Sequence, residues 1–147
     1  MSEEMKYNQV VKAVRELDRS RSDYPVVRVA FVGNITPDTL ATYLKFQGHQ
    51  NGMQVRVYQG GHDNAVQELM DFKSGLHLFE PEVIIVCLKL EGLSGALVNG
   101  FAALNQDQVQ AEVERVLERL ANIVSLARTN AAWTARTAAA RARPWPG

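Results

Sequence analysis

The chain has 147 residues, of which 46% are hydrophobic and 22% charged, and its 16 basic and 16 acidic side chains cancel at pH 7. This length and composition are typical of one soluble globular domain with its own core. The charge balance provides no overall field to attract nucleic acid or an anionic membrane, and no apolar run is long enough to cross a bilayer. The single cysteine, Cys87, excludes an internal disulfide, and we expect a cytoplasmic protein.

The N-terminal part predicts a helix followed by a buried strand. Over residues 5–19, valines at helical spacing alternate with charged side chains, which indicates an amphipathic helix. A polar connection ends at Pro25. Residues 27–32 are almost continuously apolar, and such a run is typical of a strand covered on both faces, as in a parallel sheet.

The residues after this strand predict a tight turn and a second helix. Gly33 permits a sharp turn, and Asn34 tolerates unusual backbone angles. Thr36 suits an N-cap, and Pro37 suits the first helical position. We expect this helix to end before Gly52, which would serve as its C-cap.

A second strand and a short helix come next. Residues 54–58 alternate polar and apolar side chains, which favours a half-exposed strand at the edge of the sheet. Residues 60–64 predict a second polar turn, in which Asp63 or Asn64 would cap a helix over residues 65–72. The side chains expected to face inward from this helix are Val66, Leu69 and Met70.

The third strand is predicted over residues 83–88, the most hydrophobic run of the chain, and we expect it to be central with both faces covered. A connector before it, residues 74–81, should contain one turn of helix capped by Ser74 that buries Leu76 and Phe79. A post-strand loop over residues 89–95 precedes a long helix over residues 107–128 with a wide apolar stripe.

The succession of strands and helices predicts a three-layer α/β domain with a parallel sheet in the order 2-1-3. If strand 3 is central, a fourth strand should follow near residue 130, and no such pattern is present there. We therefore expect a sheet that is truncated before strand 4. The uncovered edge of strand 3 would favour self-association.

Composition divides the chain into residues 1–26, an N-terminal helix and linker; residues 27–129, the α/β domain; and residues 130–147, an Ala- and Arg-rich tail. Because the tail has no acidic residue and differs in kind from the rest, two interpretations are open. It is either a disordered or frayed helical terminus, or a non-native segment translated out of frame.

Four segments together resemble the N-terminal domain of FkbH-like proteins of the haloacid dehalogenase superfamily. They are Phe31–Leu40, Val55–Tyr58, Asn64–Asp71 and Ser74–Val83, the last resembling the family's signature of serine, leucine, an aromatic residue, phenylalanine and proline. The resemblance implies a flavodoxin-like, SGNH-hydrolase-like fold ahead of a phosphatase-like domain. It also implies a role in loading glyceryl or acyl units onto an acyl carrier protein in secondary-metabolite biosynthesis.

The chemistry of those families is incomplete in this chain. The Asp-x-Asp motif of the phosphatase-like domain is absent, and no serine follows strand 1, where an SGNH nucleophile would stand. Thr36 and His62 are weak catalytic candidates. Thr36 is better explained as the N-cap of a helix, and His62 as a solvent-exposed histidine in a loop. Three scattered histidines and one cysteine make no metal site. We lean against an enzyme and expect no cofactor.

The remaining site hypothesis is a crevice at the carboxyl ends of the strands, where backbone N–H groups and polar side chains gather. Its residues would be Gly33, Asn34, Thr36, Gly61, His62, Asp63 and Asn64. The first hypothesis is a non-catalytic domain that binds an acyl or phosphopantetheine group, an acyl carrier protein or the phosphatase-like domain. The alternatives are a small SGNH-type hydrolase or acyltransferase and a flavodoxin-like nucleotide-binding module.

Overall fold

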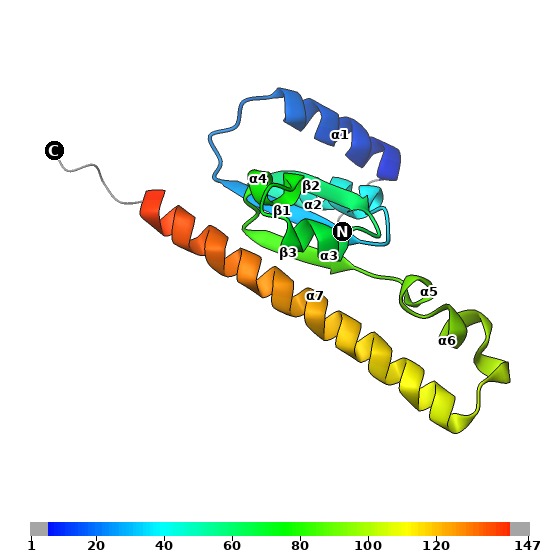
Figure 1. Ribbon diagram of the computed structural model, residues 1–147. Helices are drawn as coiled ribbons and strands as arrows, with labels where there is room; N and C mark the ends of the chain where they lie inside the picture. Colours follow the sequence, from blue (N-terminus) through cyan, green and yellow to red (C-terminus); the bar gives the residue numbers. More distant parts are fainter. Residues whose placement is uncertain (1–5, 142–147) are drawn as a thin grey trace.

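The computed structural model describes residues 6–141, with side chains described as far as residue 129 (Figure 1). Three parallel strands form one sheet in the order β2-β1-β3, flanked by helices on both faces. The strands are β1 (Val26–Gly33), β2 (Gln54–His62) and β3 (Val83–Cys87). The predicted α/β fold and the strand order are both confirmed.

The central strand β1 supplies the core of both faces. Its side chains alternate across the sheet, so Ala30 and Val32 enter one core, whereas Val29 and Phe31 enter the other. All four residues are buried. The continuous apolar run is explained by this arrangement, because a strand covered on both faces has no position for a solvated side chain.

On the Ala30 face the sheet is covered by α3 (Ala65–Met70), α4 (Gly75–Phe79) and the long helix α7 (Gln106–Arg141). Ile123 of α7 is 2% exposed and packs into this core with Leu69 and Leu76. As expected, Ser74 caps α4, its hydroxyl accepting a hydrogen bond from the His77 amide at 3.4 Å.

On the Val29 face α2 (Asp38–Gln50) lies against the sheet, and α1 (Tyr7–Arg19) packs on α2 (Figure 1). An ion pair of 2.9 Å between Lys45 and Asp18 joins the two helices. Gly52 follows the end of α2 with φ of +73°, the left-handed conformation for which glycine is suited. The helix ends before Gly52 as predicted, but its C-cap is Asn51, and Gly52 is the residue after the cap.

The predicted loop after β3 contains regular structure. Two short helices, α5 (Leu90–Leu93) and α6 (Gly95–Asn99), and a 3-10 turn, η1 (Phe101–Ala103), lead into α7. The hydroxyl of Ser94 caps α6 by accepting from the Leu97 amide, and it donates to Glu112 of α7 at 2.7 Å. These bonds fix the connection against the start of the long helix.

The strand β3 lies at the edge of the sheet, so its predicted central position was wrong. Val83 is 44% exposed and the other β3 residues are half-buried. No fourth strand pairs with β3 within residues 6–141. The strand is hydrophobic because α3 and α7 cover part of one face while α2 covers part of the other. Self-association through this edge stays a prediction.

The helix α7 is longer than the sequence pattern indicated, with 36 residues ending at Arg141. Its backbone continues through residues 130–141, because alanine and arginine are strong helix formers. The rest of the predicted tail lies outside the described residues, and the division of the chain at residue 130 stays a prediction. Among the described helices, none is apolar over a length that could span a membrane.

Candidate functional site

The carboxyl end of β1 approaches β3 so closely that only glycine fits. Gly33 has φ of +146°, and a side chain there would overlap the carbonyl of Cys87. The next amide, that of Asn34, donates to the same carbonyl at 3.0 Å. The turn after β1 is thereby fixed to the end of β3.

The side chain of Asn34 ties the two post-strand loops together. Its Nδ2 donates to the Lys89 carbonyl at 3.1 Å, and its Oδ1 accepts from the Lys89 amide at 2.7 Å. With 8% exposure, Asn34 is buried against β3 and the start of α5. Both of its polar atoms are engaged, so Asn34 serves the fold at this position rather than offering free groups to a ligand.

Thr36 does not cap α2, contrary to the prediction. The N-cap position is occupied by Pro37, without any side-chain hydrogen bond to the helix. Thr36 and His62 are both exposed, and within the described part of the chain neither makes a side-chain hydrogen bond. Their proposed catalytic use stays untested.

The predicted turn after β2 is shorter than expected, because β2 extends through Gly60 and Gly61 to His62, which pairs with Gly33. Only Asp63 and Asn64 remain between the strand and α3. Asp63 has φ of 57°, and its amide donates to the Gly33 carbonyl at 2.8 Å. The hydrogen bond holds the turn against the end of β1.

A half-buried carboxylate, that of Glu68, lies behind this turn. The hydroxyl of Tyr58 donates to Glu68 at 3.0 Å, and burial together with this contact raises the pKa of Tyr58 to about 12. The second oxygen of Glu68, Oε2, is buried beside Gly60 without a hydrogen-bond partner in the described chain. Glu68 therefore supports the carboxyl end of β2 through its contact with Tyr58.

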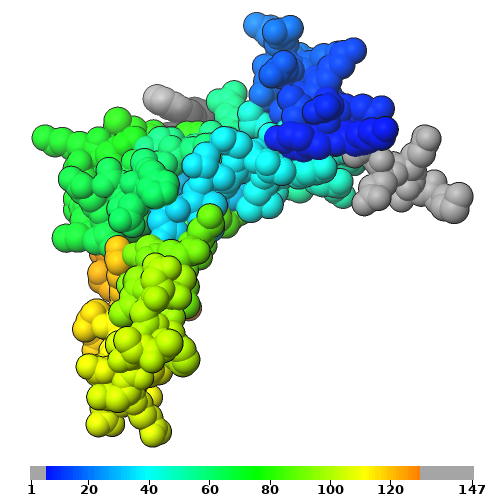
Figure 2. Space-filling model, turned by 90° about the vertical axis from the view of Figure 1, so that its right-hand side faces the viewer, coloured from blue at the N-terminus to red at the C-terminus, as the bar shows by residue number. Residues whose placement is uncertain are grey.

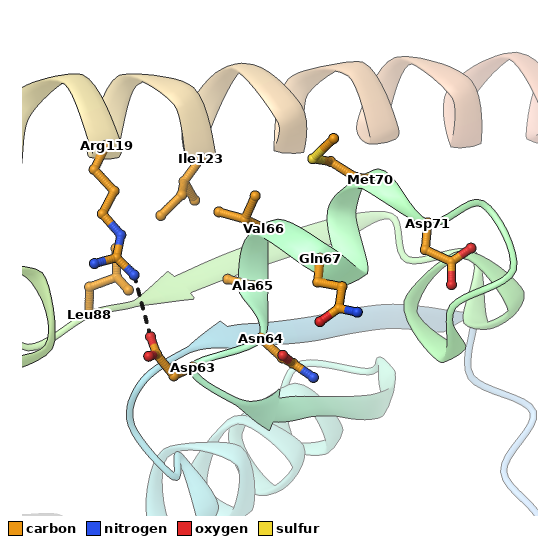
Figure 3. A pocket seen from close by; sticks show the side chains of 10 residues that line it. All are labelled: Asp63, Asn64, Ala65, Val66, Gln67, Met70, Asp71, Leu88, Arg119 and Ile123. Carbon is orange, nitrogen blue, oxygen red and sulfur yellow. Dashed lines mark ion pairs between the residues drawn. The ribbon is translucent and has the colours of Figure 1, made fainter.

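A pocket of about 550 Å³ opens between α3 and α7, beside the carboxyl ends of β2 and β3 (Figure 3). Val66 and Met70 point from α3 toward α7, and Ile123 points back from α7. Met70 was expected to face the core but is 61% exposed at this gap. The full lining comprises Asp63, Asn64, Ala65, Val66, Gln67, Met70, Asp71, Leu88, Arg119 and Ile123.

Arg119 of α7 provides the positive charge of this pocket. Its guanidinium donates to the Gly92 carbonyl at 3.1 Å and lies 3.6 Å from the carboxylate of Asp63 (Figure 3). Both side chains are substantially exposed, at 42% and 55%. An exposed ion pair of this length contributes little to stability, so exchanging Asp63 for another anion would cost the fold little.

Of the predicted crevice residues, Gly33, His62 and Asp63 lie together at the strand ends, but few of the set reach this pocket. Asp63 and Asn64 line the pocket, whereas Gly33, Asn34, Thr36, Gly61 and His62 do not. Sequence reasoning missed Arg119, Gln67 and Leu88. The apolar stripe of the long helix was the signal that could have located Ile123, but Arg119 looked like any solvated charge. Among the described side chains, no group of three or more His, Cys, Asp or Glu residues is placed to hold a metal ion.

No protein-family model and no curated protein matches this chain. It resembles the crystal structure of the N-terminal part of the protein BF1531 from Bacteroides fragilis, which contains a phosphatase domain complexed with Mg. The TM-score is 0.61 at 18% sequence identity, over 81% of this chain and 30% of that one. The chain thus spans less than a third of its structural neighbour, with which it shares an α/β fold.

Proposed function

We propose that this chain is a non-catalytic binding domain whose α3/α7 pocket receives an acyl or phosphopantetheine group presented by an acyl carrier protein. The observation that carries the proposal is the pocket itself, an apolar cleft of about 550 Å³ with a cation at one end. Its volume lies in the range of small-molecule sites, which are mostly apolar with a few orienting polar groups.

Several residues of the lining offer groups that suit an acylated phosphopantetheine, and the carboxylates of Asp63 and Asp71 also line the pocket. The apolar side chains Val66, Leu88 and Ile123 suit an acyl chain. The carboxamides of Asn64 and Gln67 can exchange hydrogen bonds with the amides of the pantetheine arm. The guanidinium of Arg119 suits the phosphate, because arginine binds phosphate oxygens in a bidentate manner.

We propose a domain without catalytic activity because the residues at the strand ends do not supply a nucleophile or a free carboxamide. The Asn34 carboxamide is committed to Lys89. In the SGNH arrangement that the resemblance implies, residues 33–36 stand at the nucleophile's place, and no serine is among them. The structural neighbour contains a phosphatase domain, and this supports a companion domain of that type as a second partner.

Titration calorimetry with octanoyl-phosphopantetheine tests the proposal directly. We expect saturable binding that Arg119→Gln weakens by about tenfold or more, because a charge-assisted contact to phosphate is worth about 1.5–3 kcal/mol. Octanoate and unacylated phosphopantetheine, measured separately, should each bind more weakly than the joined ligand.

Arg115→Gln is the matched control, since Arg115 lies on the same helix, pairs with Glu112 and does not line the pocket. Its titration should equal that of the unchanged chain. An unchanged chain with no saturable heat, or equal binding by the two arginine variants, would refute the pocket assignment. A holo-acyl carrier protein that binds no better than its apo form would refute delivery by a carrier.

A further inference from the structure

Over its part with described side chains, residues 106–129, the helix α7 carries one apolar seam that is buried by the fold and a second that is largely exposed. The first seam contains Val116 and Ile123, which are 8% and 2% exposed. The second contains Val113, Leu117 and Val124, which are 38%, 59% and 44% exposed, with Leu120 half-buried between them. The second seam therefore presents large apolar side chains to solvent along three turns of helix.

The spacing of this second seam is that of a coiled coil. Positions 113, 117, 120 and 124 are separated by four, three and four residues, the alternation of a and d positions in a heptad. The first half of α7 extends beyond the sheet together with α5 and α6, as Figures 1 and 2 show. A second helix could reach the seam there without displacing the sheet.

We propose that two copies of this chain pair through the second seam, with their α7 helices antiparallel. In the proposed register, Val113 of one copy packs against Val124 of the other, and Leu117 packs against Leu120. The two-fold axis between the copies generates each of these two layers a second time. All four apolar side chains of each copy are then covered by apolar side chains of the other.

The charges beside the seam favour the same register. On one flank the heptad places Asp107, Glu114, Ala121 and Arg128 at successive e positions. In an antiparallel pair this flank meets its own counterpart, so Asp107 of each copy lies opposite Arg128 of the other, and Glu114 lies opposite Ala121. Two ion pairs of opposite charge bracket the apolar layers.

A parallel pair would lack this complementarity. Its e positions would lie beside the g positions of the other copy, and those include Val116 and Ile123, which are buried in their own domain. The observed burial leaves the e flank as the side of the seam that is open to a partner's charges, and Asp107 and Arg128 on this flank are complementary in the antiparallel arrangement.

The seam is separate from the α3/α7 pocket. Arg119 follows Leu117 by two residues, so their side chains point about 200° apart around the helix axis. Pairing therefore leaves the pocket open, and ligand binding and association can be measured independently.

Sedimentation equilibrium tests the proposal. We expect the unchanged chain to approach twice its single-chain mass of 16.3 kDa as concentration rises. Leu117→Asp should weaken association by about 100-fold or more, because it places a carboxylate in each apolar layer it enters. Asn122→Asp adds the same charge at an exposed position away from the seam and should associate like the unchanged chain.

A charge exchange tests the orientation. Arg128→Asp and Asp107→Arg should each weaken association by placing like charges opposite one another, and the double variant should restore it. A monomer at all concentrations would overturn the proposal. So would a dimer that Leu117→Asp leaves intact, a result that would favour pairing at the β3 edge. Failure of the double variant to restore association would overturn the antiparallel register.

Discussion

Replacing Ile123 with alanine tests whether α7 belongs to the folded core. Ile123 is 2% exposed and packs with Leu69 and Leu76 beneath the sheet. The substitution removes three carbon atoms, which at about 0.8 kcal/mol each correspond to about 2.4 kcal/mol of lost burial. Because the site borders the pocket, the space left behind opens to water, and we expect a total loss near the lower end of the usual range of about 2–5 kcal/mol.

The assay is urea unfolding followed by circular dichroism, with Asn122→Ala as the control on the same helix. Asn122 is exposed, so its replacement should change the free energy of unfolding by less than about 0.5 kcal/mol. We expect Ile123→Ala to lower that free energy by about 2–3 kcal/mol. If the two variants unfold alike, α7 does not stabilise the sheet, and the pocket between α3 and α7 loses one of its walls.

Three other predictions follow from individual contacts. Gly33→Ala should lower the free energy of unfolding by about 3 kcal/mol or more, because the position has a positive φ and the added Cβ would overlap Cys87. Gly95→Ala is the control and should be nearly neutral, because the added Cβ meets no atom within 4 Å. Equal urea midpoints for the two variants would contradict this. Since the pKa of Tyr58 rises from 10.0 to about 12 on folding, its contribution to the free energy of unfolding should be constant below pH 10 and should fall between pH 10 and 12. Tyr58→Phe should remove that part of the pH dependence in urea titrations at graded pH. Burial raises the pKa of the Cys87 thiol, so alkylation by iodoacetamide at pH 8 should be slow and should accelerate in urea; rapid labelling of the folded chain would contradict its half-buried position.

The sheet could be predicted because its signals are local. The apolar run of β1 requires cover on both faces, and the alternation in Gln54–Tyr58 requires an edge. The lengths of the connections then leave few topologies for three parallel strands. By contrast, the extension of β2 to His62 depends on pairing with Gly33, a contact between residues far apart in the sequence.

The site was predicted less well because the residues that form it are far apart in the sequence. Asn34 looked like a loop residue open to ligands, and only the folded chain shows its carboxamide bound to Lys89. Arg119 lies 56 positions after Asp63, and the sequence contains no signal that α7 crosses above α3. A pocket formed by two helices follows from their packing angle, which periodicity does not encode.

The long helix shows why an apolar stripe is an incomplete prediction. The periodicity of the sequence correctly predicts an apolar face on this helix, but it predicts a single stripe. In the structure the stripe consists of a buried seam with Val116 and Ile123 and an exposed seam with Leu117 and Val124. A helix that served only its own domain would need the first seam alone. The second seam has heptad spacing and opposite charges at Asp107 and Arg128, which its own sheet does not use. The surplus of apolar surface on α7 is therefore best explained by a contact outside the single chain.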